Sequence, residues 1–138
     1  MHRLSYHSHA LTTNPAGLDA IYAESAAFNA SAGITGALLF ADGRFAQILE
    51  GDQAAITSLY DRITRDSRHD HVTFDYLIEV AGRLFPGWSM ARITDDSKTD
   101  IPMARILAAA TATDYDTSIR QLRSLARTAR APLSDPDR

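Results

Sequence analysis

Strand-like and helical hydrophobic patterns alternate along the first part of the chain. Residues 3–8 alternate with a period of two, which predicts a short strand whose Tyr6 points to the same side as Leu4. After a turn-like segment at residues 12–17, side chains recur at helical spacing, which predicts an amphipathic helix. The recurring positions are Leu18, Ile21, Tyr22, Ser25, Phe28 and Asn29. Ser25 and Asn29 are therefore polar residues on an otherwise apolar stripe.

Two further apolar runs, residues 34–40 and 44–50, are joined by a short turn that contains Gly43. This arrangement predicts a β-hairpin. In the second arm, the period of two places Gln47 between Phe45 and Leu49 on one face of the strand. The amide of Gln47 is thus expected to project among large apolar side chains.

A second amphipathic helix is predicted next, with Asp52 as its N-cap and with Ile56, Leu59, Tyr60 and Ile63 as its apolar stripe. Segments rich in β-branched and aromatic residues at 72–80 and 89–93 predict two more strands. The order becomes β-α-β-β-α-β-β. This order predicts an α+β fold of the ferredoxin-like type, a mixed sheet with two helices on one face, extended by one strand.

The composition changes from residue 95 on. Residues 101–110 and 113–129 have helical patterns, with Pro102 in the first turn of the former, and predict two C-terminal helices. We therefore expect a folded domain at residues 1–94 and a helical extension with a frayed tail at residues 95–138.

Composition and charge narrow the range of possible functions. The 138 residues carry 14 Lys and Arg against 17 Asp and Glu, a net charge of −3, which makes a nucleic-acid partner unlikely on electrostatic grounds. With no cysteine there is no disulfide, thiolate metal site or cysteine nucleophile. The N-terminus does not resemble a signal peptide, and no run reaches the about 18 apolar residues of a membrane span. We expect a cytoplasmic protein that does not enter a membrane.

Several polar side chains are predicted to converge between the two helices and the sheet. They are Tyr6 and Gln47 from strands, Ser25 and Asn29 from the first helix, and Arg62 from the second. An unpaired buried amide costs about 1–3 kcal/mol, so Gln47 needs a partner. A planar polar ligand could form hydrogen bonds with all of these side chains. Alternatively, each side chain forms its hydrogen bonds with neighbouring protein groups.

Other candidate residues carry weaker signals. Arg68 and His69 suit either a helix C-terminus or an anionic ligand, and Trp88 and Met90 suit core packing on one face of their strand. The five histidines lie near the N-terminus or on a turn and show no metal-ligand spacing, so no metal site is expected. No phosphate-binding loop or nucleophile elbow is present, which disfavours an enzyme.

Several segments, in order along residues 2–94, together resemble the BLUF family, the blue-light sensors using FAD. The segments are 4–8, Asn29 with 33–38, 43–51, 65–69 and 83–90. The family's fold agrees with the order predicted from periodicity. The resemblance implies a photoreceptor that binds FAD noncovalently between the two helices.

The resemblance also assigns roles to individual residues. Tyr6 matches the photoactive tyrosine, Gln47 the glutamine between it and the flavin, and Trp88 and Met90 the switch pair on the last strand. The remaining residues match positions that hold the cofactor: Ile21 and Phe45 on the ring, Ser25, Asn29 and Arg62 around it, and Asp66, Arg68 and His69 near the ribityl and phosphates.

The implied mechanism is light-driven electron and proton transfer from the tyrosine to the flavin, which rearranges the glutamine hydrogen bonds. The signal is then expected to pass through the last strand and the C-terminal helices to a partner protein. We expect a short stand-alone photoreceptor, not an enzyme, in a homodimer or larger homo-oligomer. The alternatives are a light-independent ferredoxin-like module that binds a small molecule, and a small acylphosphatase- or monooxygenase-like enzyme on the same scaffold.

Overall fold

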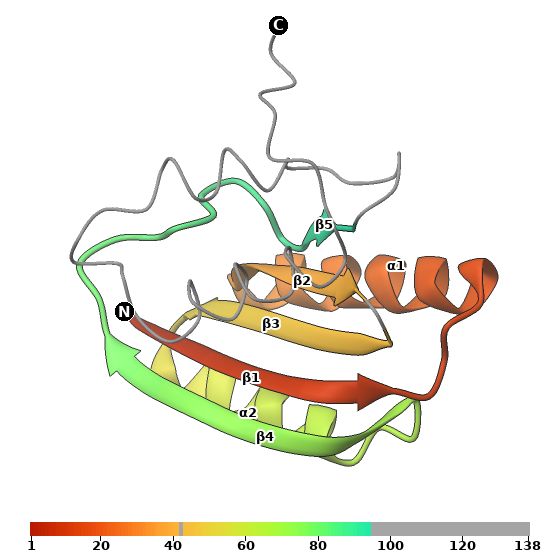
Figure 1. Cartoon of the computed structure of the whole chain (residues 1–138). Coiled ribbons are helices and arrows are strands. Elements are labelled where there is room, and N and C mark those ends of the chain that lie inside the picture. The colour runs from red at the N-terminus through yellow and green to blue at the C-terminus, as the bar shows by residue number, and fades with distance from the viewer. Residues whose placement is uncertain (42, 95–138) are drawn as a thin grey trace, which may run out of the picture.

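A computed structural model of the chain describes residues 1–41 and 43–94 (Figure 1). Its elements follow the order β-α-β-β-α-β-β, which confirms the prediction. They are β1 (His2–Ala10), α1 (Pro15–Ala32), β2 (Thr35–Ala41), β3 (Arg44–Gly51), α2 (Gln53–Thr64), β4 (His69–Glu79) and β5 (Ala91–Ile93). The two predicted C-terminal helices lie outside the described residues.

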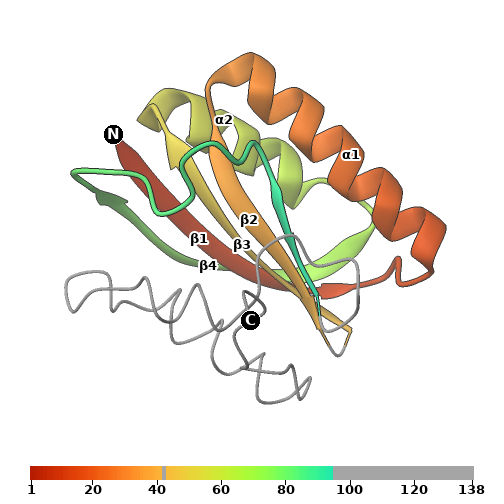
Figure 2. The ribbon, with the colours of Figure 1, turned by 90° about the horizontal axis from the view of Figure 1, so that it is seen from above.

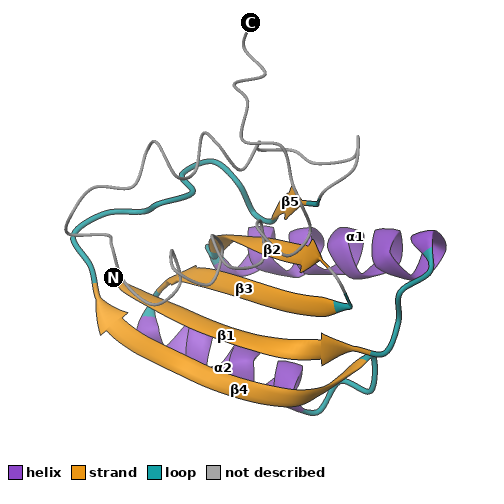
Figure 3. Cartoon of the chain, in the orientation of Figure 1, coloured by secondary structure: helices purple, strands orange, loops and turns teal. Residues whose placement is uncertain are grey.

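The five strands form one mixed sheet in the order β4-β1-β3-β2-β5. Neighbouring strands are antiparallel except β2 and β5, which are parallel. Both helices cover the same face of the sheet, as the view from above and the view coloured by secondary structure show (Figures 2 and 3). This is the predicted α+β ferredoxin-like arrangement with an additional strand.

The ends of the helices follow local chemistry. The side chain of Asn14 accepts a hydrogen bond from the amide of Gly17 at 2.8 Å and caps α1, and Pro15 occupies the first turn. Gly33 ends α1 with a left-handed φ of 68°. Asp52 is the N-cap residue of α2, as predicted, and its side chain makes no capping hydrogen bond.

Strand pairing extends β1 and β4 beyond their predicted ends. His9 pairs with Asp70, and Ala10 pairs with His69, so that β4 begins at His69 and not at residue 72. His69 and His71 therefore lie in a strand and not on a turn, contrary to the sequence-based prediction. Periodicity missed this extension because the ladder hydrogen bonds form between residues far apart in the sequence.

The last strand is shorter than predicted. β5 spans Ala91–Ile93, whereas residues 89 and 90 lie in a bend before it. The backbone there follows Gly87, whose φ is 82°, and the Trp88 carbonyl accepts a hydrogen bond from the amide of Gly36 at 3.0 Å. Because residues 88–90 are not in a strand, the period of two does not place Trp88 and Met90 on one face.

The core fills the space between the helices and the sheet. Leu4 and Leu49 are buried from the sheet side, Ile21 from α1 and Ile56 from α2. The helices and strands thus bury the faces that their hydrophobic periods predict. Among the described residues, no helix is long and apolar enough to cross a membrane.

Gly36 is required by the close approach of β2 and β3. A Cβ atom at this position would lie 2.0 Å from the carbonyl oxygen of Ile48, which is backbone and cannot rotate away. We expect Gly36→Ala to lower the free energy of unfolding by about 3 kcal/mol, the upper end of usual overpacking effects, in urea denaturation. Gly82→Ala is the control, because nothing lies within 4 Å of its Cβ position. Equal midpoints for the two variants would contradict the prediction.

Candidate functional site

A pocket lies between α1, α2 and the helix-covered face of the sheet. About 520 Å³ of space lies between the protein atoms there, part of it open to solvent. It is lined by α1 (Ile21, Ser25, Phe28, Asn29), by α2 (Leu59, Ile63), by strands (Tyr6, Leu38, Phe45, Gln47) and by the segment from α2 into β4 (Asp66, Arg68, His69). The structure therefore brings together most of the polar residues that the sequence predicted to converge.

Two pocket residues, Tyr6 and Gln47, belong to a chain of three buried side chains. Tyr6 and Gln47 are direct partners in the register of β1 and β3, so their side chains lie on the same face of the sheet. The Tyr6 hydroxyl donates a hydrogen bond to Oε1 of Gln47. Nε2 of Gln47 lies 3.7 Å from Sδ of Met90, to which it donates. The Gln47 amide thus links a phenol on one side to a thioether on the other.

Burial keeps the Tyr6 phenol protonated. Desolvation raises the pKa of Tyr6 well above its ordinary value, and the nearby Tyr60 and Asp66 raise it further. The tyrosine can therefore act as a hydrogen-bond donor to Gln47 at any physiological pH. In the structure the phenol donates to the oxygen of Gln47, so the nitrogen of the amide is the end that faces Met90.

Asn29 connects the pocket to the segment before β5. Its side chain is buried, and Nδ2 donates a hydrogen bond of 2.7 Å to the carbonyl oxygen of Ser89. An amide has a second N–H and a carbonyl oxygen in addition, so the same side chain can bind a ligand and hold the backbone beside Met90.

The rim near the start of β4 carries paired charges. Nη2 of Arg68 lies 2.7 Å from the Asp66 carboxylate, and Nη1 lies 3.2 Å from Glu24. Hydrogen bonding to Arg68 lowers the pKa of Asp66 despite its partial burial. Arg68 is therefore held at the pocket with its charge already balanced, and an anionic ligand would have to share it.

His69 is held by two hydrogen bonds behind the pocket wall. Its Nε2 lies 2.7 Å from the carbonyl oxygen of Ile63, and its Nδ1 lies 2.8 Å from the Ser8 hydroxyl. Because a carbonyl can only accept, Nε2 donates to Ile63, and Nδ1 forms the second hydrogen bond with the Ser8 hydroxyl. The ring joins β1, β4 and the end of α2.

Three predicted site residues do not line the pocket: Arg62, Trp88 and Met90. Arg62 does not line it; its guanidinium carbon lies 4.6 Å from the ring centroid of Phe28. Trp88 is 39% exposed, whereas Met90 is 6% exposed and contacts Gln47, so the prediction that both are core residues is wrong for Trp88. The structure thus has Met90, and not Trp88, beside the glutamine.

Four apolar lining residues were not predicted as site residues: Phe28, Leu38, Leu59 and Ile63. Three of them belong to the apolar helix stripes seen in the sequence, and Leu38 pairs with Gln47 in the sheet. The stripe shows that such residues point inward, but an apolar side chain has the same signal whether it faces the core or a ligand.

The residues that line the pocket suit a ligand with a planar ring system and polar edges. Aromatic and aliphatic side chains supply flat apolar walls, and the amides of Asn29 and Gln47 can donate and accept along the edge of such a ring.

Comparison with known proteins identifies the kind of domain. The family profile described as "BLUF: Sensors of blue-light using FAD" matches residues 1–91. The photoactivated adenylate cyclase subunit beta of Euglena gracilis is 36% identical over 86 residues, which are 62% of this chain and 10% of that protein. The chain spans about a tenth of the length of the curated relatives it matches.

Solved structures agree with this assignment. BlrB, described as a BLUF protein in its dark state, superposes with a TM-score of 0.67 at 28% identity, and the match covers 94% of each chain. Klebsiella pneumoniae BlrP1, solved with FMN and cyclic diGMP, gives a TM-score of 0.72 at 31% identity over 89% of this chain and 33% of that one. BlsA in its ground state gives 0.65 at 31% identity, covering 70% of this chain and 66% of that one.

Proposed function

This chain belongs to the BLUF family of sensors of blue light using FAD, and from this premise we propose that Tyr6 and Gln47 carry out its light response. The matched residues form a sensor module whose cofactor is FAD, as predicted from the sequence. The observation that carries the proposal is the buried Tyr6–Gln47–Met90 chain, of which Tyr6 and Gln47 line the pocket. The light-independent small-molecule module is not favoured.

The pocket residues fit the cofactor. Ile21 and Phe45 would pack against the flavin ring, and Ser25, Asn29 and Gln47 would bind its polar edge. Asp66, Arg68 and His69 stand where the ribityl and phosphate groups would leave the pocket. Arg62 can take part only by leaving its position over Phe28, the pocket residue beside it.

When bound, FAD absorbs blue light and is a strong oxidant in its excited state. Tyr6 would supply one electron to the excited flavin, and its phenolic proton would leave through Oε1 of Gln47, its hydrogen-bond acceptor. Both the electron and the proton return to Tyr6 on recombination, so the cycle produces no net oxidation. The side chain that differs after the cycle is Gln47.

Gln47 can store the change because its two ends differ in hydrogen-bond role and hardly in shape. After rotation, the carbonyl oxygen of Gln47 would face Met90 and could not donate to Sδ as Nε2 does in the structure, and after tautomerisation the nitrogen would keep only one of its two hydrogens. Met90 and the Ser89 carbonyl held by Asn29 lie directly before β5. A change at Gln47 would therefore act, through its contact with Met90, on the residue directly before the edge strand β5.

We assign the sensor unit to residues 1–94 and the output to residues 95–138, which follow β5 in the chain. The family couples to effectors in some relatives, as the light-regulated adenylyl cyclase structures indicate for those proteins. A downstream protein partner, a homo-oligomeric state and a cytoplasmic location stay predictions for this chain.

The purified protein is expected to be yellow, with flavin bands that shift to longer wavelength after a blue pulse and return in the dark without a change in oxidation state. Visible absorption spectra in the dark, after the pulse and during recovery measure this directly. A protein that neither carries nor takes up FAD would leave the small-molecule module as the better account. A flavin that bleaches without a shift would contradict the proposed role of Gln47.

A further inference from the structure

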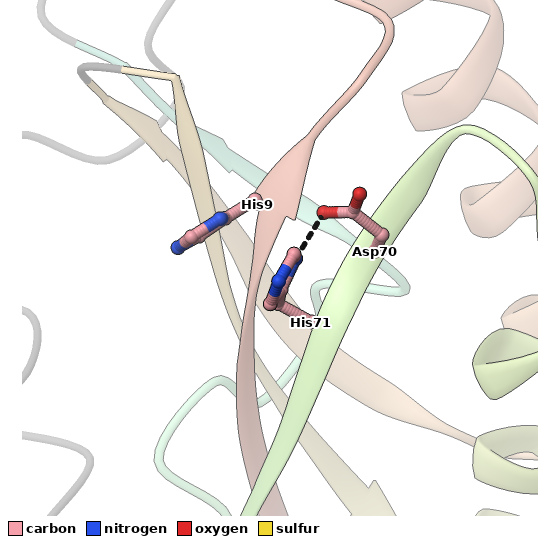
Figure 4. A group of neighbouring side chains, drawn as sticks. All are labelled: His9, Asp70 and His71. Carbon is pink, nitrogen blue, oxygen red and sulfur yellow. Dashed lines mark hydrogen bonds and ion pairs between the residues drawn. The ribbon is translucent and has the colours of Figure 1, made fainter.

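A second group of chemically reactive side chains lies at the ends of β1 and β4, outside the pocket. His9 projects from β1, and Asp70 and His71 project from β4 (Figure 4). Their possible ligand atoms all lie within 4.8 Å of one another, and the two imidazole rings have centroids 4.7 Å apart. Nδ1 of His71 lies 2.8 Å from Oδ1 of Asp70. All three side chains are open to solvent.

The backbone brings these residues together in an unusual way. His9 and Asp70 are register partners, and the register of β1 and β4 shifts between His7 and His9. Consecutive residues of a strand normally point to opposite faces, yet Asp70 and His71 contact each other. His71 has a φ of 51°, a left-handed conformation that is uncommon for a residue with a side chain. Such outliers concentrate at functional sites.

We propose that His9, Asp70 and His71 bind a divalent transition-metal cation of the Zn²⁺ class. Two imidazoles and one carboxylate match the ligand preference of these ions, whereas Mg²⁺ and Ca²⁺ prefer sites made of oxygen atoms. Three protein ligands leave coordination positions for water, which suits an exposed, exchangeable site.

The required rearrangement is small. Ligand atoms at about 2.0–2.1 Å from a tetrahedral ion are about 3.4 Å apart. From the observed separations, the donor atoms have to approach by less than about 1.5 Å, which rotation of exposed side chains supplies. No sequence pattern indicates this site, because His9 and the pair Asp70–His71 are brought together only by strand pairing.

A cation next to the site should weaken metal binding. Arg44 on β3 is the register partner of His9 and lines the same surface hollow as the three ligands. Removing its charge reduces the electrostatic repulsion of a bound ion. Arg44→Gln is therefore expected to bind Zn²⁺ more tightly than the wild-type protein.

The site also lies directly behind the pocket. Ser8 and His69 precede His9 and Asp70 in their strands and are hydrogen-bonded to each other at 2.8 Å. The His69 side chain lines the pocket and is hydrogen-bonded to Ile63 of α2, whereas the three proposed ligands lie at the strand ends. A bound ion would therefore connect β1 to β4 next to His69, which lines the pocket.

The test is a Zn²⁺ titration of the untagged full chain in the dark, in competition with a chromophoric chelator. We expect one Zn²⁺ per chain, reversed by EDTA and not displaced by Mg²⁺. His9→Ala and His71→Ala should each weaken binding by at least about tenfold, since even residues that only support a ligand contribute 10–100-fold. The matched control is His2→Ala at the other end of β1, which should bind as the wild type does.

The proposal is overturned if the wild-type protein does not bind Zn²⁺, if the double variant of His9 and His71 binds it as well as the wild type, or if His2→Ala is weakened equally. Circular dichroism of each variant checks that the fold is retained. The titration needs no light response, so its result is independent of the function proposed for the pocket.

Discussion

Tyr6→Phe is expected to bind FAD as the wild-type protein does and to show no red-shifted state after a blue pulse. The substitution removes only the hydroxyl, so the ring still packs in the pocket wall beside Tyr60. The lost hydroxyl is the donor to Gln47 and the source of the transferred proton. The amplitude of the light-minus-dark difference spectrum should fall to the baseline, measured at equal flavin occupancy.

Tyr60→Phe provides the matched control. The Tyr60 ring lies 5.6 Å from that of Tyr6, so the substitution removes a hydroxyl from the same neighbourhood without touching Gln47. We expect this variant to keep the full red shift. A normal shift in Tyr6→Phe, or the loss of the shift in both variants, would show that the Tyr6 hydroxyl has no special part in the response.

Glu50→Ala is expected to lower the free energy of unfolding by about 3–5 kcal/mol, because it breaks a buried ion pair and leaves a buried guanidinium without its carboxylate. Arg3 and Glu50 are 2% and 0% exposed, and Nε of Arg3 lies 3.1 Å from Oε2 of Glu50. The carboxylate also accepts hydrogen bonds from the backbone amides of Leu84 and Phe85 at 2.6 and 2.9 Å.

Two controls separate the buried pair from a general loss of charge. Asp61→Ala removes an exposed carboxylate on α2 that pairs with Arg65. It should change the unfolding free energy by less than about 0.5 kcal/mol. Glu50→Gln keeps the shape and one acceptor oxygen and should fall between the two. Urea denaturation of the three variants measures this order. A Glu50→Ala protein as stable as Asp61→Ala would refute the structural role assigned to the pair.

Glu50 also holds the segment before β5 in place. Its carboxylate holds residues 84 and 85, and Arg83 donates to the carbonyl oxygens of Glu50 and Gly33. At the other end of the same segment, Asn29 holds Ser89 and Gln47 contacts Met90. The segment is therefore anchored at both ends, so that a change at Gln47 acts on one anchored end only.

Much of the fold was predictable because each helix and most strands have a hydrophobic pattern within their own segment of the sequence. The period of two in the strands and the helical stripes gave the element order, and Asn14, Pro15 and Gly33 mark the ends of α1 by side-chain and backbone chemistry. The strand ends were less predictable, because β1 and β4 extend each other through ladder bonds that no local pattern records.

The candidate site was predictable in its polar members. Tyr6 and Gln47 stood out because strand alternation put polar groups on apolar faces, and Ser25 and Asn29 because they interrupt a helical stripe. All four line the pocket. Arg62 was predicted to line the pocket and does not. A residue at the edge of an apolar stripe can turn its long side chain outward, and here the guanidinium lies over the ring of Phe28.

The sequence by itself therefore determined the element order, the inward faces and the family of this protein, since these depend on local periodicity and on motifs within short segments. Only the tertiary structure decided that Met90 and not Trp88 contacts Gln47, that Arg3 and Glu50 form a buried pair, and that His9 meets Asp70 and His71. The physical reason is that these contacts depend on strand register, on a bend before β5 and on a left-handed backbone at His71, all of which arise from pairing between distant segments.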